Sequence, residues 1–415
     1  MRRPKVVQLS KELSASGGVG TYLLHLCTAL ENAGQEVIVI HADPRSLASP
    51  SGVSHQFYVE KFDEFEGEHN GRTRTSRVME ILETVKPDIV HIQGNNNFLL
   101  EDEIRRRYPA VKSLHVYDFC PSGNKFHHAL EKVCRHPTGP LCIPRMVYKR
   151  CLLTKRPSVI WWHYRRCVEA NRNNANYRKL IVASEFVKRQ AVATGYPAGQ
   201  IEVVPYFTPL PERWPSACEG ERGHPGLVGG TVLFVGRVVR EKGLDHLLSA
   251  FSQVRTSWRL LVAGDGPDLG RAKRLARRLR LDSRIEFAGW ADRELLSRFY
   301  REASLVVLPS IWPEPFGLVG IEAMSYEKPV VAFKVGGIPE WLQDGVTGFL
   351  ISPFDVREMA ERINYLLEHP EVAQKMGMKG RARVEREFSE EKHMTRLLNI
   401  YEAVRDTKVP ASVLT

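Results

Sequence analysis

The chain has 415 residues, of which 43% are hydrophobic and 26% charged, and it carries a formal net charge of +11 at pH 7. This length favours two domains of roughly 200 residues each, and the composition excludes a chain that is disordered over most of its length. The positive charge favours anionic partners: nucleotide phosphates, a phosphorylated acceptor, anionic lipid or nucleic acid.

The first half of the chain alternates short apolar runs with amphipathic segments. A strand at 5–9 leads into a glycine-rich turn at 14–20, and leucines at helical spacing predict a helix at 21–32. The series continues with a strand at 36–41, a helix at 75–85, strands at 87–92, 111–115 and 179–184, a helix from Glu185 and a strand at 201–205. Short apolar strands separated by helices predict a doubly wound parallel sheet.

Residues 207–230 interrupt this rhythm with four prolines and five glycines, which predicts a linker. A second α/β series follows. Its predicted strands lie at 231–236, 258–263, 285–289, 303–308 and 329–333, and its predicted helices at 243–254, 268–279, 318–326, 356–368, 370–387 and 389–405. We therefore expect an α/β fold with two Rossmann-like doubly wound domains, 1–206 and 231–388, facing a central cleft.

The sequence contains no apolar run near the roughly 20 residues that cross a bilayer. Its basic start lacks the apolar stretch and cleavage site of a signal peptide, so we expect a cytoplasmic protein. An odd number of cysteines argues against a disulfide scaffold; they are Cys27, Cys120, Cys134, Cys142, Cys151, Cys167 and Cys218.

The strongest motif runs from Glu314 to Glu322, after the predicted strand that ends at Leu308. Backbone N–H groups at the start of the following helix, together with the helix dipole, suit a diphosphate. Carboxylates on either side of such an anion site should bind hydroxyl groups, one on a ribose and the other on a sugar. An ordinary helix-capping arrangement is the alternative.

The Glu-x7-Glu spacing with interior Pro-Phe-Gly-Leu resembles the donor-site signature of glycosyltransferase family 4. Further segments resemble that family in the same order: 233–243, 261–267, 285–289, 336–340 and 344–350. The resemblance implies the GT-B fold, transfer with retention of anomeric configuration, and attack from the front side with the donor phosphate as base. It also implies that the last helix, within 389–415, packs back on the first domain.

The resemblance also implies roles for particular residues. Arg237 and Lys242 should bind the donor diphosphate, Glu322 the ribose, and Glu314 the donor sugar as a catalytic residue. Donor binding should also involve the start of the helix, at Phe316, Gly317, Leu318 and Val319. No Asp-x-Asp pair occurs in the sequence, so cations and the helix N-terminus must balance the leaving diphosphate. We expect no metal and no cofactor besides the donor substrate, a UDP- or GDP-sugar.

In the first half, Ser16-Gly-Gly-Val-Gly20 resembles the first loop of the family, which implies donor binding at Gly17 and Gly18. The segment lacks the Gly-x-Gly-x-x-Gly pattern, which argues against NAD. His115 ends a predicted strand, and the resemblance implies a catalytic His that reaches the transferred sugar. Many relatives place an Asp directly after this His, whereas two residues separate it from Asp118 here. A His held by backbone at the sheet edge is the alternative.

Two further segments have no assigned role. Cys120, Cys134, Cys142 and Cys151 lack a tight Cys-x2–4-Cys pair, which favours independent thiols over a metal site, although three histidines lie nearby (His127, His128 and His136). Residues 140–190 hold twelve Lys or Arg and two acids, and 145–166 mixes cations with aromatics. The segment suits a membrane headgroup layer, an acceptor groove, or a solvated helix face.

The sequence therefore predicts a retaining glycosyltransferase that moves a hexose-type sugar to a glycan, lipid-linked or small-molecule acceptor in polysaccharide or glycoconjugate biosynthesis. It would work in the cytoplasm, with peripheral contact to the inner face of the membrane through 145–166. The alternative function is a nucleotide-sugar epimerase of similar two-domain fold. Nucleic-acid binding is not expected, because the basic residues form no recognisable module.

Overall fold

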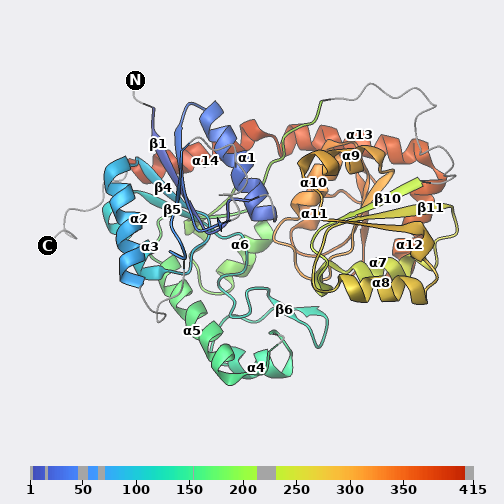
Figure 1. Cartoon of the computed structure of the whole chain (residues 1–415), viewed down its shortest axis with the longest axis horizontal. Coiled ribbons are helices and arrows are strands. Elements are labelled where there is room, and N and C mark those ends of the chain that lie inside the picture. Colours follow the sequence, from blue (N-terminus) through green and yellow to red (C-terminus); the bar gives the residue numbers. More distant parts are fainter. Residues whose placement is uncertain are drawn as a thin grey trace. The chain divides into compact units, whose positions relative to one another are not determined.

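The computed structural model describes residues 3–14, 17–44, 55–63, 71–152, 154–212 and 230–406, with only the backbone for 71–74. The chain divides into two compact units, Met1–Tyr206 with Glu390–Thr415, and Phe207–Ser389 (Figure 1). Most of the predicted linker, together with Ser16 and Cys218, lies outside the described residues.

The first unit is built on a parallel seven-stranded sheet in the order β3-β2-β1-β4-β5-β8-β9. Its strands are β1 (Lys5–Ser10), β2 (Glu36–His41), β3 (Gln56–Tyr58), β4 (Ile89–Ile92), β5 (Ala110–Ser113), β8 (Leu180–Val182) and β9 (Ile201–Val203). The central strands are buried along nearly their whole length, because helices cover both faces of the sheet. The strand order reverses between β1 and β4, and ligands of such sheets bind beyond the carboxyl ends of strands at this point.

The helices of the first unit are α1 (Gly18–Asn32), α2 (Gly71–Val85), α3 (Phe98–Arg107), α4 (Cys142–Tyr148), α5 (Pro157–Asn174), α6 (Glu185–Val192) and α14 (Glu390–Arg405). Side chains cap two of them: Asn97 accepts from the N–H of Leu100, and Ser184 from that of Val187. The chain's last helix, α14, packs against α1 and β5.

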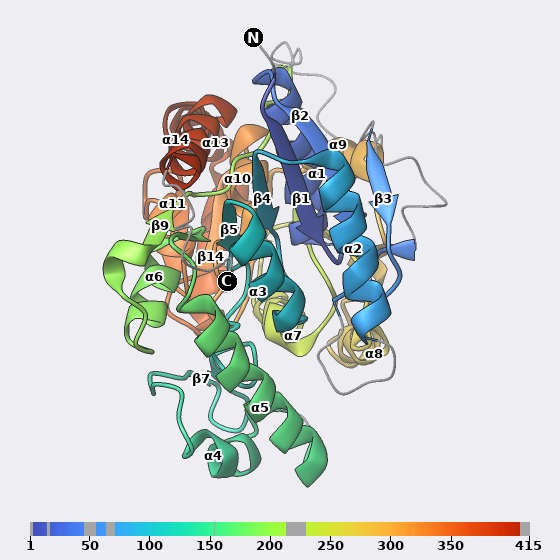
Figure 2. The ribbon, with the colours of Figure 1, turned by 90° about the vertical axis from the view of Figure 1, so that its left-hand side faces the viewer.

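A small lobe lies between β5 and α5 in the chain. It contains the antiparallel hairpin of β6 (Phe126–His127) and β7 (Lys132–Val133), followed by α4. Figure 2 shows α4 beside one end of α5, away from the central strands of the first unit. The lobe has a small core of its own, formed by Met146, Cys151 and Ile160.

The second unit has a parallel six-stranded sheet in the order β12-β11-β10-β13-β14-β15. Its strands are β10 (Gly230–Val235), β11 (Trp258–Ala263), β12 (Ile285–Gly289), β13 (Leu305–Leu308), β14 (Val330–Phe333) and β15 (Gly348–Ile351). The helices are α7 (Leu244–Phe251), α8 (Leu269–Arg278), α9 (Arg293–Glu302), α10 (Leu318–Ser325), α11 (Ile338–Trp341), α12 (Val356–Glu368) and α13 (Pro370–Glu387). Here the order reverses between β10 and β13. The prediction of two Rossmann-like doubly wound units is thus confirmed.

Candidate functional site

Three loops converge at the carboxyl edge of the second sheet, beside the point where its strand order reverses. The loop after β13 is bound to the loop after β10 by a hydrogen bond from the N–H of Ile311 to the carbonyl of Glu241, at 2.9 Å. The N–H of Gly337, after β14, donates to the carbonyl of Glu314 at 2.8 Å. A Cβ atom at Gly336 would lie 2.0 Å from that carbonyl oxygen, so the close approach requires glycine.

Two of the predicted site residues meet in these loops. The Nζ atom of Lys242 lies 2.6 Å from Oε1 of Glu314, and the ammonium also lies 5.7 Å from the centre of the Trp312 ring. The hydroxyl of Ser310 donates to the same carboxylate oxygen. Glu314 is 5% exposed, whereas the side chain of Lys242 is 27% exposed. The pair therefore presents its cation toward solvent and keeps its carboxylate inside.

The helix α10 begins at this edge with a glycine cap. Gly317 adopts a φ of 90°, which favours glycine, and no side chain caps the helix. The indole N–H of Trp341 donates to the carbonyl of Phe316 at 2.6 Å. A Cβ at Gly320 would lie 1.9 Å from the Trp341 ring, so the ring fixes the first turn of α10. The amides of Leu318 and Val319 belong to this turn, where N–H groups have no acceptor within their own helix.

Glu322 lies in α10 and is half-buried. Its Oε2 atom accepts a hydrogen bond of 3.0 Å from the hydroxyl of Tyr300, in α9, and the ring of Tyr300 stacks on Tyr326. Burial raises the pKa of Glu322, and the hydrogen bond from Tyr300 partly opposes this rise. Within the described residues, the carboxylate of Glu322 bonds to Tyr300 of α9, and it forms no ion pair with Lys242.

Arg237 lies in the loop after β10 and is exposed. The N–H of Val238 donates to the carbonyl of Asp265 at 2.8 Å, and a Cβ at Gly266 would lie 2.4 Å from the carbonyl oxygen of Val238. The loops after β10 and β11 are thus held together. Among the residues that the structure describes, no carboxylate pairs with the guanidinium of Arg237, which leaves its donors for an anion.

In the first unit, His115 lies two residues beyond the end of β5, so the prediction that it ends the strand is wrong by two residues. The side chain is buried, and both ring nitrogens have partners: Nδ1 lies 2.5 Å from the hydroxyl of Tyr206, and Nε2 lies 2.7 Å from Oε1 of Gln93. Burial lowers the pKa of His115 to about 4, so the ring is neutral at pH 7. Together with Tyr22 it lines a recess too narrow for a water molecule.

The partners of His115 belong to a larger buried network. The amide nitrogen of Gln93 lies 2.7 Å from Oε1 of Gln8 and 3.0 Å from Nδ1 of His91. That Nδ1 atom also lies 2.7 Å from the hydroxyl of Tyr401, in α14. No motif marks Gln93 in the sequence, although its place directly after β4, beside the strand reversal, is a signal that could have found it.

Gly17 is the N-cap of α1 and has an extended backbone. Protein packing requires glycine at Gly20, where a Cβ would lie 1.9 Å from the carbonyl oxygen of Ser14, but no atom lies within 4 Å of a Cβ built at Gly18. Space above Gly18 is therefore open to a ligand.

The described cysteines are free thiols. Nδ1 of His127 lies 3.1 Å from the sulfur of Cys151. Nowhere in the described part of the chain are three or more His, Cys, Asp or Glu residues arranged to bind a metal ion. None of the described helices has the length and apolar character of a membrane span.

Two family profiles match the chain. The profile described as "Glycosyltransferase Family 4" matches residues 16–210, and the one described as "Glycosyl transferases group 1" matches residues 229–383. Together they cover most of both units.

Curated relatives match over shorter stretches. The alpha-D-kanosaminyltransferase of Streptomyces kanamyceticus is 34% identical over 148 residues, which is 35% of this chain and 38% of that protein. The D-inositol 3-phosphate glycosyltransferase of Mycolicibacterium smegmatis is 35% identical over 203 residues, 47% of this chain and 46% of that protein. The matches thus span less than half the length of these relatives.

Solved structures resemble the whole chain in fold. Sucrose-phosphate synthase from Thermosynechococcus elongatus has a TM-score of 0.75 and 23% identity, covering 98% of this chain and all of that one. The Anabaena protein HepE, solved with UDP and glucose, has a TM-score of 0.71 and 20% identity, covering 97% of this chain and all of that one. At these identities the likeness concerns the fold alone, which is of the GT-B type.

Proposed function

Because the chain belongs to glycosyltransferase family 4, we propose that it is a retaining glycosyltransferase. It moves a hexose-type sugar from a UDP- or GDP-sugar to a glycan, lipid-linked or small-molecule acceptor. The observation that carries the proposal is the pair of Lys242 and Glu314 beside an uncapped helix start, at the strand reversal of the second sheet. This place and these groups suit a sugar diphosphate.

The donor diphosphate would bind to cations and backbone amides. The side chain of Lys242 is 27% exposed, and Arg237 has no carboxylate partner among the described residues, so both can contact phosphate oxygens. The free N–H groups at Leu318 and Val319 would face the same charge. These groups would stabilise the negative charge that develops as the diphosphate leaves, and we propose that they do so without a divalent metal.

Glu314 and Glu322 would bind the neutral parts of the donor. Glu322, held by Tyr300, is placed in the helix that follows the diphosphate amides and would accept hydrogen bonds from the ribose hydroxyls. Glu314 would exchange its contact with Lys242 for a hydroxyl of the sugar when the diphosphate takes over the cation.

His115 would contact the transferred sugar from the first unit. Both of its ring nitrogens are occupied, so contact with a substrate requires that one partner, Tyr206 or Gln93, gives way. Because the ring is neutral at pH 7, it would act as a hydrogen-bonding group rather than as a charged one.

Retention would follow from attack on the face that the diphosphate leaves. The acceptor oxygen forms its bond to the anomeric carbon while the bond from that carbon to the phosphate oxygen breaks. The acceptor proton passes to a phosphate oxygen of the leaving diphosphate, so the chain needs no basic side chain for this step. Lys242 and Arg237 would lower the energy of the departing anion.

The test begins with a panel of UDP-, GDP- and ADP-sugars measured by thermal shift, followed by transfer assays with the donor that binds. NMR of the product gives the anomeric configuration, and inversion would refute retention. Assays with and without a chelator test whether a metal is needed.

The epimerase alternative has its own experiment. Incubation with UDP-GlcNAc alone, without acceptor, would yield ManNAc from an epimerase and no such product from a transferase.

A lipid-linked acceptor would place the enzyme at the inner face of a membrane, in polysaccharide or glycoconjugate assembly.

A further inference from the structure

The lobe between β5 and α5, together with the first turns of α5, carries an unusual combination of exposed side chains. Tyr148 is 83% exposed, and Trp161 and Trp162 are 54% and 41% exposed. Leu141, at the start of α4, is 64% exposed. Large aromatic and aliphatic side chains on one small lobe cost free energy in water, so they indicate a contact partner.

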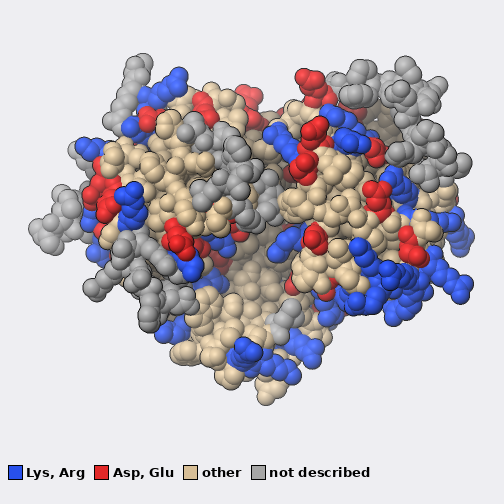
Figure 3. Space-filling view, in the orientation of Figure 1, with Lys and Arg blue, Asp and Glu red and all other residues tan. Residues whose placement is uncertain are grey.

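The lobe and the start of α5 are strongly basic. From Cys120 to Arg166 the sequence holds ten Lys or Arg and a single acid, Glu131. Arg150, Lys155 and Arg156 are exposed and form no ion pair within the described residues. On the face shown in Figure 3, Lys and Arg side chains border tan surface around the position of α4.

Helical spacing brings the aromatics and cations together on α5. Trp161, Trp162 and Arg165 are exposed and lie within a little more than one turn, while Ile160 and Cys167 face the interior. Tyr148 lies in α4, which packs against α5. Aromatic rings with cations at one surface match the headgroup layer of a bilayer, where rings enter the interface and cations meet lipid phosphates.

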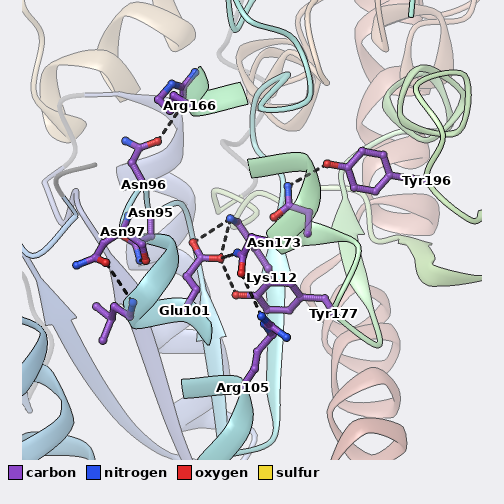
Figure 4. Close-up of polar contacts among 12 residues, drawn as sticks. Asn95, Asn96, Asn97, Glu101, Arg105, Lys112, Arg166, Asn173, Tyr177 and Tyr196 are labelled. Atoms are coloured by element: carbon purple, nitrogen blue, oxygen red, sulfur yellow. Dashed lines mark hydrogen bonds and ion pairs between the residues drawn. The ribbon is translucent and has the colours of Figure 1, made fainter. Parts of the chain in front are cut away.

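The helix α5, on which Trp161 and Trp162 lie, is tied to the rest of the first unit. Glu101 and Lys112 are buried and lie 2.9 Å apart, and the amide of Asn173 in α5 donates to the same carboxylate (Figure 4). Nearer its aromatic end, α5 is tied to the loop after β4 by a hydrogen bond from Arg166 to Asn96, at 2.9 Å. These contacts anchor α5 to the first unit, while Trp161 and Trp162 remain exposed.

From these observations we infer that the α4–α5 lobe docks on an anionic lipid bilayer, with Trp161, Trp162 and Tyr148 at the interface and Arg150, Lys155 and Arg156 on lipid phosphates. The inference concerns binding to a surface and does not depend on the sugar donor or on any reaction. An anionic glycan would explain the cations, but it would not need the exposed aliphatic Leu141.

Sedimentation with vesicles tests this. The full chain is mixed with vesicles of phosphatidylcholine alone or of phosphatidylcholine with phosphatidylglycerol, and binding is expected only to the second. Replacing Arg150, Lys155 and Arg156 by Gln should weaken the partition coefficient roughly a hundredfold, since each cation near an anionic surface contributes about fivefold.

The control replaces three exposed cations outside the lobe, on helix α8 of the second unit. Arg274, Arg277 and Arg278 are exposed in α8, where Figure 3 also shows a dense group of basic side chains. Replacing these three by Gln removes the same net charge and should leave vesicle binding near wild type. Equal loss in both triple variants would show that only net charge matters and would overturn the inference.

A fluorescence measurement distinguishes a bilayer from a soluble polyanion. Lipids brominated in their acyl chains should quench part of the tryptophan emission of the wild type, and the W161F/W162F variant should lose that quenching. If quenching is absent, or if vesicles fail to bind while a soluble anionic polysaccharide protects the lobe, the bilayer is not the partner.

Discussion

The ammonium of Lys242 lies 2.6 Å from the carboxylate of Glu314. The two residues thus neutralise each other, although their proposed ligands are different parts of one donor. Binding of a diphosphate must therefore draw Lys242 away from Glu314 or share it. The carboxylate that is released becomes free to accept a sugar hydroxyl, so arrival of the diphosphate would prepare the sugar subsite.

Replacing Glu314 by Gln separates these two effects. The cation of Lys242 should then bind UDP about three- to tenfold more tightly, because a buried competing carboxylate is gone. Turnover should fall at least tenfold, since the carboxylate no longer meets the sugar. Calorimetry with UDP and initial rates measure the two. The S310A variant keeps the charge and loses one hydrogen bond to Glu314, so its UDP affinity should change little. Weaker UDP binding in E314Q would contradict the competition.

Replacing Lys242 by Met should weaken UDP binding about ten- to a hundredfold, because a hydrogen bond to a charged group contributes about 1.5–3 kcal/mol. Arg237→Gln should have a similar or smaller effect, as this side chain is more exposed. The dissociation constants of UDP and of uridine are measured for each variant and compared. A loss that is equal for uridine would mean that neither cation contacts the diphosphate.

Replacing Glu322 by Ala should abolish measurable donor binding with little change in thermal unfolding. Tyr300 donates a hydrogen bond to this carboxylate, so the Y300F variant removes that bond and keeps the carboxylate. Its unfolding temperature measures how much the bond contributes to stability. It should shift the unfolding temperature as much as E322A does while retaining most of the donor affinity. If Y300F loses donor affinity as severely as E322A, the carboxylate serves to hold α9 rather than the ribose.

His115→Ala should lower turnover more than donor affinity, because the proposed contact is with the transferred sugar. Gln93→Leu should resemble it in part, since Gln93 binds Nε2 and orients the ring. For both variants, kcat and the dissociation constant of the donor are measured separately and compared with the wild type. Unchanged turnover in H115A would leave the His as a structural member of the buried network.

The buried histidines should make the first unit sensitive to acid. Burial lowers the pKa of His115 and of His393 to about 4, below the ordinary value of 6.5. The unfolded chain therefore takes up protons before the folded one does as pH falls below 6.5, so stability is full near pH 7 and is lost progressively down to about pH 4. Each ring accounts for up to about 3 kcal/mol. Denaturant unfolding between pH 7 and 4.5 should show this slope, and H393Q should reduce it. A flat profile would refute neutral burial.

Much of the proposed donor site could be predicted from the sequence because its motifs are local. Strand, glycine turn and helix start follow one another within a few residues, so Lys242, Gly317 and Glu322 could be placed on their elements directly. The contact between Lys242 and Glu314 could not be predicted, since it depends on how closely two loops approach, and that approach is set by glycines such as Gly336.

The buried network of the first unit escaped prediction for a related reason. Its long-range contacts join Gln8 to Tyr401, Gln8 to Gln93 and His115 to Tyr206, which lie 393, 85 and 91 positions apart, and no local pattern links them. The helix α4 was also missed: it is seven residues long, has no side-chain cap and contains Pro144, so neither length nor capping signals it.

The hydroxyl of Tyr401 completes the buried network around His91, although Tyr401 follows the whole second unit in the chain. Until α14 emerges, Gln8 and His91 lack a partner that the completed first unit gives them. The amino-terminal domain therefore cannot finish folding when its own strands have been synthesised, and the second domain is complete before it. A nascent chain stopped before Glu390 should hold a protease-sensitive first domain beside a resistant second one.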